Sequence, residues 1–183
     1  MTNVQGNFPK TRLRRNRMKD FSRRLVAENN LGTNDLILPL FVCEGNNVED
    51  PIQSMPGVSR YSIDKLLYKV EEAVKLSIPA IAIFPQIETS LKNKEGSLAF
   101  DENNLDCRSI KSIKKEFSGI GIICDVALDP FTDHGHDGLV IDNKIDNDKT
   151  LEVLEKQALV QVHAGCDVIA PSDMMDGRVG RIR

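Results

Sequence analysis

Short apolar runs recur along the chain from residue 36 onward, and their spacing is the first indication of its fold. They occupy residues 36–42, 80–84, 119–126 and 167–170 and are rich in isoleucine and valine. None shows the strict alternation of apolar and polar positions that is typical of a half-exposed strand. We therefore expect four strands that are buried on both faces, as in a parallel sheet covered by helices.

Helical patterns separate these runs. Ser62 precedes a segment with apolar residues at a 3.6-residue period and can cap a helix that ends before Pro79. A second helix is expected over 104–117, and a third from about 147 to Gly165, a natural C-terminal glycine. The third helix is expected to bury Leu151, Leu154, Ala158 and Val162. Strand and helix in alternation predict right-handed βαβ units and a parallel α/β sheet.

The loops that follow the predicted strands are long enough to hold a functional site. The strands begin near 36, 80, 119 and 167, which leaves roughly a dozen loop residues after each strand in addition to the helix. Sites in α/β proteins lie at the carboxyl ends of the strands. A short β-hairpin or lid is expected over 138–147, with Asn143 and Lys144 at its turn.

The loop at 125–138 is the densest chemical cluster in the chain. It holds four acids and two histidines: Asp125, Asp129, Asp133, His134, His136 and Asp137. Three uses are open: oxygen ligands for a hard cation, mixed histidine and carboxylate ligands for a transition metal, or charge partners for a cationic substrate. A solvated aspartate-rich loop without such a role is the fourth alternative, and an isolated H-x-H is more often structural than ligating.

The fourth predicted strand ends in a second polar segment. Ser172 or Asp173 can cap a helix that begins near Gly177. A serine at the carboxyl end of a strand is also well placed to bind a substrate carboxylate or amine. The motif G-x-S-x-G is absent, so the sequence does not indicate a hydrolase nucleophile.

Composition and charge exclude several classes of protein. The 183 residues are 40% hydrophobic and 28% charged with a net charge of −3, which is a globular composition, and no apolar run approaches the length of a membrane helix. Residues 1–24 carry eight bases and one acid, but they lack the features of a targeting signal or a nucleic-acid reader. The four cysteines form no C-x-x-C pair, so we expect free thiols in a reducing compartment, the cytoplasm.

Five segments together form a recognisable pattern, and they lie at 12–15, 36–42, 54–60, 125–138 and 170–178. In these segments the sequence resembles the porphobilinogen synthase family, also called δ-aminolevulinic acid dehydratase. The resemblance implies a (β/α)8 barrel in which two molecules of 5-aminolevulinate condense to porphobilinogen. It also implies a homo-oligomer, commonly an octamer, held by an N-terminal arm, which we place at 1–34, with the first half of the barrel at 35–183. No nucleic-acid or membrane partner is expected.

The resemblance assigns roles to individual residues. Asp125 matches the active-site acid, and Ser172 matches a substrate-binding serine. In zinc-dependent members three cysteines occupy the positions of Ala127, Asp129 and Asp137, so the chain resembles the aspartate-rich, magnesium-stimulated branch and catalytic zinc is not expected. Asp129 and Asp137 would then shape the second substrate site, while the usual family Mg²⁺ site lies beyond residue 183.

The two Schiff-base lysines of the family also lie beyond residue 183. The strand spacing supports this placement, because eight such units and an arm total roughly 330–350 residues, the size of a barrel with long loops. We therefore expect an N-terminal half that ends in the fourth helix and does not run the condensation alone. Two alternatives stay open: a compact metal-dependent lyase built on loop 125–138, and a non-catalytic fragment that assembles with full-length subunits.

Overall fold

The computed structural model describes residues 6–183, which divide into two compact units. The first unit extends to Gly32 and contains a 3-10 helix, η1 (Leu13–Arg17), and a short α-helix, α1 (Asp20–Leu25). Neither helix has a buried residue within the structure described. The second unit, Thr33–Arg183, contains the sheet and all of the longer helices.

A six-stranded sheet forms the centre of the second unit, in the order β2-β3-β1-β4-β5-β8. The four predicted strands are confirmed as β1 (Ile37–Val42), β4 (Ala80–Pro85), β5 (Gly121–Val126) and β8 (Val168–Pro171), all parallel to their neighbours. The pattern did not predict β2 (Glu49–Pro51) or β3 (Ser59–Tyr61), because three-residue strands are too short to show a period. β3 pairs parallel to β1, and β2 pairs antiparallel to β3.

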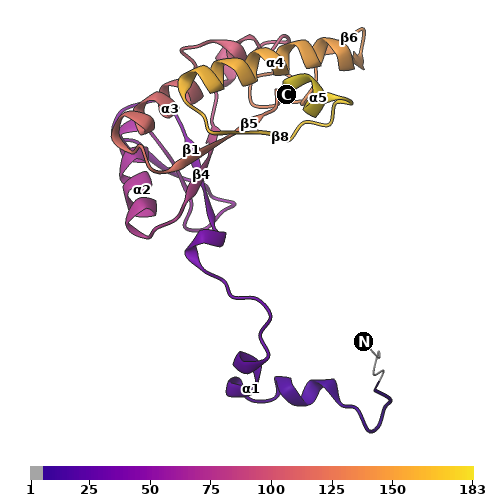
Figure 1. Ribbon diagram of the computed structural model, residues 1–183. Coiled ribbons are helices and arrows are strands. Elements are labelled where there is room, and N and C mark those ends of the chain that lie inside the picture. The colour runs from indigo at the N-terminus through magenta and orange to yellow at the C-terminus, as the bar shows by residue number, and fades with distance from the viewer. Residues whose placement is uncertain (1–5) are drawn as a thin grey trace. The chain divides into compact units, whose positions relative to one another are not determined.

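Helices α2 (Ile63–Lys75), α3 (Leu105–Glu116) and α4 (Asn147–Ala164) connect the strands (Figure 1), and α5 (Arg178–Ile182) ends the chain. Short 3-10 helices lie at Thr33–Asp35 (η2), Thr89–Leu91 (η3) and Ser97–Phe100 (η4). The prediction of parallel β/α units is thus confirmed. The strands do not close into a barrel within residues 6–183.

The ends of α2, α3 and α4 follow the expected chemistry with one exception. The Asn104 and Asp146 side chains accept hydrogen bonds from the first-turn amides of α3 and α4, and Gly165 ends α4 with a left-handed φ of 112°. Ser62 occupies the N-cap position of α2 but does not cap it. Its hydroxyl instead donates to the Asp64 carboxylate at 2.6 Å and accepts from the Val48 amide at 2.9 Å, so the prediction of a Ser62 cap is wrong.

The buried core lies between the sheet and the helices. Strand residues that point toward the helices are almost fully buried: Leu40, Val42, Ile81, Ile83, Ile122, Cys124 and Val126. The opposite positions, such as Phe41, Phe84 and Ile123, are only half-buried. The prediction of burial on both faces is therefore wrong for this chain, because the helices of residues 33–183 cover one face of the sheet (Figure 1).

The buried side of α4 also differs from the prediction. Leu154 and Ala158 are buried as expected, but Val162 is half exposed. Two glutamines, Gln157 and Gln161, are buried in its place. The buried stripe is therefore rotated toward polar residues that an apolar pattern does not register.

A two-stranded hairpin, β6 (Val140–Ile141) and β7 (Lys144–Ile145), confirms the predicted hairpin after the acidic loop. Its turn residues are Asp142 and Asn143, one position earlier than expected, and both have positive φ angles. Asparagine and aspartate tolerate this conformation best among non-glycine residues.

All four cysteines are free thiols, and no helix within residues 6–183 is long and apolar enough to cross a membrane.

Candidate active site

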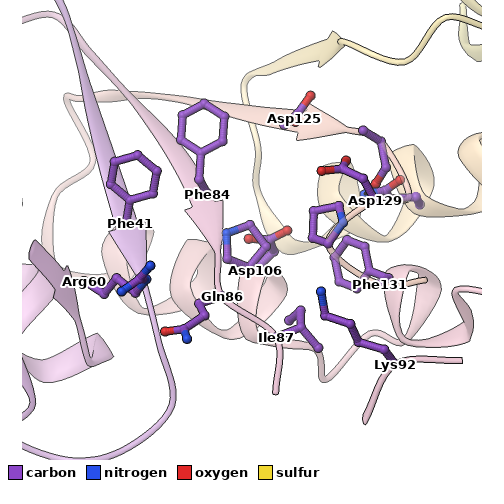
Figure 2. A pocket seen from close by; sticks show the side chains of 14 residues that line it. Phe41, Arg60, Phe84, Gln86, Ile87, Lys92, Asp106, Asp125, Asp129 and Phe131 are labelled. Atoms are coloured by element: carbon purple, nitrogen blue, oxygen red, sulfur yellow. The ribbon is translucent and has the colours of Figure 1, made fainter. Parts of the chain in front are cut away.

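A pocket of about 370 Å³ lies at the carboxyl ends of β1, β4 and β5. Figure 2 shows Asp125 at the end of β5 and Asp129 on the loop that follows it. Phe41 of β1 and Phe84 of β4 form an aromatic wall, with ring centroids 5.6 Å apart. The pocket thus combines carboxylates with an apolar surface, which is the usual make-up of a site for a small organic ligand.

Asp125 and Ser172 are brought together by two neighbouring parallel strands. Asp125 of β5 is in register with Ala170 of β8, so Ser172 follows two residues further along. The Ser172 hydroxyl donates a hydrogen bond of 2.6 Å to Asp125 Oδ1. Burial raises the pKa of the Asp125 carboxyl above its ordinary value, the hydrogen bond from Ser172 acts in the opposite direction, and the Asp137 charge raises it.

Asp129 and Asp137 form a second carboxylate pair in the same loop. Burial raises the pKa of Asp129, and the charges of Asp137 and Asp125 raise it further. The Asp137 carboxylate also lies within hydrogen-bonding reach of Asp129. Two carboxylates whose charges repel each other favour a shared proton or a cationic partner between them. The structure thus brings Asp125, Asp129, Asp137 and Ser172 into one region.

Backbone hydrogen bonds hold the acidic loop in place. The amides of Phe131 and Thr132 both donate to the Leu128 carbonyl at 2.9 Å. Asn93, in the loop after β4, accepts from the Asp133 amide at 3.2 Å and donates to the Phe131 carbonyl at 3.3 Å. These bonds tie the loops after β4 and β5 together, so the pocket wall has a defined shape.

The two histidines contribute to the same scaffold. His134 Nδ1 accepts a hydrogen bond from the His136 amide at 3.2 Å, and His136 Nδ1 accepts from the Gly138 amide at 3.0 Å. The Thr132 hydroxyl donates to the His136 carbonyl at 3.0 Å. Both imidazoles therefore stabilise their own loop.

The loop contains no cysteine, so it lacks the thiolates that select zinc. Ala127 is buried and offers no ligand atom, and Asp129 and Asp137 supply hard carboxylate oxygens where soft thiolates would select zinc. Within residues 6–183 no group of three or more histidine, cysteine, aspartate or glutamate side chains is placed to hold a metal ion.

Capping of the last helix, the alternative use of Ser172 and Asp173, is not what the structure contains. Gly177 is the N-cap of α5, and no side chain caps the helix there. Asp173 is fully buried and accepts from the Met175 amide at 2.8 Å, while Arg178 lies 3.5 Å from its other oxygen. Ser172 thus faces Asp125, and Asp173 stabilises the turn after β8.

Several pocket residues were not predicted from the sequence. Arg60 of β3 and Lys92 of the loop after β4 add positive charge, and Arg60 also pairs with Asp50 at 2.9 Å. Asp106, in the first turn of α3, lines the pocket although it is only 3% exposed. The aromatic wall of Phe41 and Phe84 could have been found, since both residues lie on the strand face opposite the buried core.

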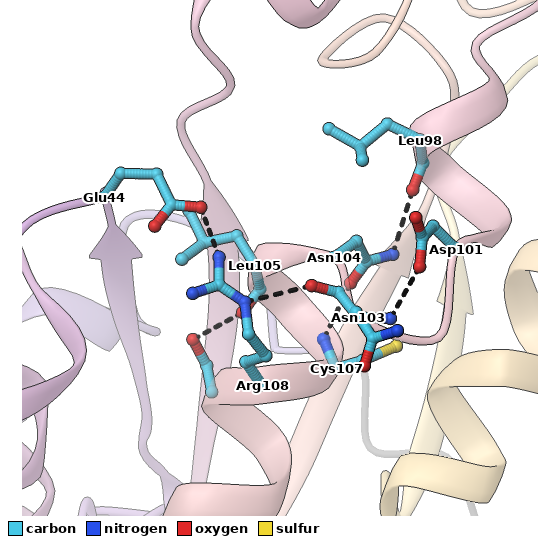
Figure 3. A network of polar contacts seen from close by, with 9 residues as sticks. Glu44, Leu98, Asp101, Asn103, Asn104, Leu105, Cys107 and Arg108 are labelled. Carbon is cyan, nitrogen blue, oxygen red and sulfur yellow. Dashed lines mark hydrogen bonds and ion pairs between the residues drawn. The ribbon is translucent and has the colours of Figure 1, made fainter.

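The start of α3 is held in place by polar contacts with two loops (Figure 3). The Asn104 side chain reaches back to the carbonyls of Leu98 and Ala99 at 3.2 and 3.1 Å. Arg108 pairs with Glu44 in the loop after β1 and donates to the Asn103 carbonyl at 3.0 Å. These contacts fix the helix turn that carries Asp106.

Comparison with known proteins gives one family. A family model of delta-aminolevulinic acid dehydratase matches residues 10–183. The chain is 59% identical over 172 residues to delta-aminolevulinic acid dehydratase of Bradyrhizobium diazoefficiens, covering 94% of this chain and 49% of that protein. It is 45% identical over 176 residues to the dehydratase of Methanothermus sociabilis, covering 96% of this chain and 54% of that protein. The chain therefore spans about half the length of these relatives.

Structural comparison agrees with this result. The crystal structure of the delta-aminolevulinic acid dehydratase (porphobilinogen synthase) of Toxoplasma gondii, in complex with the reaction product porphobilinogen, is similar with a TM-score of 0.89 at 43% identity. The match covers 94% of this chain and 49% of that one. Strand order, the acidic loop and the extent of the family match lead to the same conclusion: the chain belongs to the delta-aminolevulinic acid dehydratase family, of which it covers the N-terminal half.

Proposed function

We propose that this chain supplies the N-terminal half of a porphobilinogen synthase active site, in which two molecules of 5-aminolevulinate condense to porphobilinogen. The observation that carries the proposal is the contact between the Ser172 hydroxyl and Asp125 Oδ1 at 2.6 Å, at the ends of two neighbouring strands beside the pocket. The substrate offers an ammonium, a ketone and a carboxylate. The pocket offers aspartate carboxylates that can bind the ammonium, and it offers Arg60 and Lys92 that can bind the substrate carboxylate.

Asp125 serves as the proton-transferring group of this half-site. A carboxyl whose pKa is raised by burial exchanges protons closer to neutral pH than an exposed aspartate does. Ser172 holds one carboxylate oxygen and so fixes the orientation of the other toward substrate. In this proposal Asp125 is the catalytic residue, and Ser172 positions its carboxylate beside the bound substrate.

Asp129 and Asp137 bind the ammonium group of the second substrate molecule. Their mutual repulsion is relieved when a cation lies between them, and this provides electrostatic selectivity for an amine. Zinc is not required in this scheme, because neither residue is a thiolate. Any Mg²⁺ acts outside the acidic loop, where the family resemblance places its site.

The imine-forming lysines are provided by the other half of the barrel, as the resemblance implies. A lysine that captures a ketone needs a lowered pKa and a place at a strand end. Lys92 lies on a loop at the pocket rather than on a strand. The role of residues 6–183 is therefore to bind substrate and transfer protons, not to form the covalent intermediate.

In this proposal the N-terminal unit mediates homo-oligomer contacts, as the resemblance implies for the N-terminal arm of the family. Support comes from its surface, on which large apolar side chains are exposed beside a basic segment, namely Phe8, Leu13, Met18, Phe21 and Leu25. Exposed apolar groups on this scale mark interaction surfaces. The free thiols fit a reducing compartment, for which we propose the cytoplasm.

A chimera tests the proposed function. The matched 172-residue segment of the Bradyrhizobium relative is replaced by the corresponding part of this chain, and porphobilinogen formation from 5-aminolevulinate is measured. We expect an active chimera whose kcat falls about 100-fold or more in Asp125→Asn, because a positioned acid–base group contributes on that order. This chain by itself is expected to form no product.

The matched control is Asp133→Asn, an exposed aspartate of the same loop, which should leave kcat unchanged. A folded but inactive chimera, or equal kcat values for the two variants, would overturn the proposal. Product formation by this chain alone would show that the assignment of the lysines to the other half is wrong. The non-catalytic alternative predicts a chimera that folds but is inactive.

A further inference from the structure

The end of β5, the strand that carries Asp125, extends beyond its pairing with β4. The β4–β5 register ends at Ile83 and Cys124, whereas β5 stays paired with β8 as far as Val126. Within residues 6–183, the side of β5 that faces β4 therefore has no paired strand beyond Cys124. This unpaired stretch lies at the level of the candidate site.

The carbonyls of Asp125 and Ala127 point to this unpaired side. Backbone groups of alternate residues point to alternate sides of a strand. The Gly121 amide donates to the carbonyl of the residue before β4 at 2.9 Å, and the Ile122 carbonyl accepts from the amide of the residue before β8 at 3.0 Å. Odd-numbered residues of β5 thus bond toward β4, and even-numbered residues bond toward β8.

Pro85 explains why β4 does not supply a donor to Asp125. In a parallel pair a carbonyl accepts from the amide one position beyond its register partner. The Val42 carbonyl, in register with Pro85, accepts in this way from the Gln86 amide at 2.7 Å. Extending the β4–β5 register by one residue sets Phe84 opposite Asp125, so the Asp125 carbonyl would accept from residue 85. Proline has no amide hydrogen, so this bond cannot form.

Two glutamines of α4 supply the donors instead. Gln161 Nε2 donates to the Asp125 carbonyl at 2.9 Å. Gln157 Nε2 donates to the Ala127 carbonyl at 3.2 Å. Residues four apart on a helix are separated by about 6 Å along its axis, and residues two apart on a strand by about 6.6 Å, so the two spacings match. A carbonyl only accepts, so the nitrogen of each buried amide makes the contact.

We propose that Gln161 and Gln157 are positioning residues of the candidate site, which replace the missing β4 partner and anchor the end of β5 to α4. They act on Asp125 only through the backbone. Because β5 bonds here to α4 rather than to β4, the ends of the two strands stay apart, and both line the pocket. Gln161 has the larger effect, since it holds Asp125 itself. The effect on turnover rests on the proposed function, but the anchoring of β5 does not.

The pKa of Asp125 reports on its orientation in this chain without substrate. The hydrogen bond from Ser172 lowers this pKa, so Ser172→Ala raises it in the native chain. Gln161→Met keeps a side chain of similar length but has no donor. In that background we expect Ser172→Ala to shift the pKa by about half as much or less, because the two contacts are coupled. Carboxyl carbon-13 NMR titration measures both shifts, and equal shifts would overturn the proposal.

Pro85→Ala provides a rescue that a mere packing role of Gln161 would not predict. It restores an amide hydrogen opposite the Asp125 carbonyl. We therefore expect it to raise the midpoint of urea unfolding more in the Gln161→Met background than in the native chain. If Gln161→Met does not fold by itself, we expect Pro85→Ala to recover folding. An equal effect in both backgrounds, or no recovery, would overturn the proposal.

Ser62→Ala is the matched control, because it also removes a bond between a buried side chain and the backbone, the one from the Val48 amide. It should leave the Ser172→Ala shift unchanged. In the chimera, Gln161→Met should lower kcat about tenfold or more with little change in KM, since a small displacement of a reacting group costs that much. Unchanged kcat in this variant, or an equal loss in Ser62→Ala, would overturn the positioning role. An inactive parent chimera contradicts the proposed function alone, and the substrate-free titration then decides.

Discussion

Asn104 makes the contacts whose removal we expect to cost the most stability for a single polar side chain. It is 2% exposed and lies at the N-cap of α3. Its Oδ1 accepts from the Cys107 amide at 2.8 Å and its Nδ2 donates to the Leu98 carbonyl (Figure 3). The same Nδ2 also donates to the Ala99 carbonyl. Asn104→Ala would leave three backbone groups without these partners.

The magnitude follows from how deeply each bond is buried. Loss of an N-cap costs about 1 kcal/mol, and a buried carbonyl left unsatisfied costs about 1–3 kcal/mol. The bond to Ala99 is buried, whereas the bond to Leu98 is only partly so and water can replace it. We therefore expect Asn104→Ala to lower the free energy of unfolding by about 2–4 kcal/mol. Asn104→Ser, which keeps a capping oxygen, should recover about 1 kcal/mol.

Urea unfolding followed by circular dichroism measures this change. Asn103→Ala is the matched control, because the recorded contacts of Asn103 are made by its backbone, and it should stay within about 0.5 kcal/mol of the native chain. The reasoning is refuted if Asn104→Ala costs no more than the control. It is also refuted if Asn104→Ser is as destabilising as Asn104→Ala, since the cap would then contribute nothing.

Two predictions concern the carboxyl groups of the pocket, and both are measured by carboxyl NMR titration of this chain. Ser172→Ala should raise the pKa of Asp125, because the hydrogen bond from Ser172 favours the ionised form; an unchanged or lower pKa would contradict this contact. Asp137→Asn should lower the pKa of Asp129, because the Asp137 charge disfavours its ionisation; a pKa that does not fall would place the two groups too far apart to interact.

The sequence predicted those parts of the fold in which local chemistry and burial agree. The helix expected over 104–117 is found at Leu105–Glu116, because a capping residue and an apolar period mark the same segment. Where a competing partner exists, the prediction is wrong. Ser62 has the right residue type and position for a cap, but its oxygen accepts a hydrogen bond from the Val48 amide instead of from a first-turn amide, and its hydroxyl donates to Asp64.

The adjacency of Asp125 and Ser172 follows from topology alone. Residues that follow neighbouring parallel strands meet at the same edge of a sheet, so two strand ends with polar residues are enough to predict the contact. The strands that flank β1 on its other side carry no comparable signal. Arg60 was therefore not predicted as a pocket residue, because it lies on a three-residue strand that is too short to show a period.

Three buried polar residues near the candidate site, Asp106, Gln157 and Gln161, were not predicted from the sequence. An aspartate in the first turn of a helix usually complements the helix dipole, and glutamines one turn apart usually mark a solvated face. In this chain the aspartate of α3 and both glutamines of α4 are buried instead. The glutamines donate to the carbonyls of Asp125 and Ala127 at the end of β5. Rules based on local sequence fail where the carbonyls at a strand end accept hydrogen bonds from side chains instead of from a neighbouring strand. Such departures concentrate at functional sites. A polar residue on the buried stripe of a helix is thus itself a signal of a nearby site.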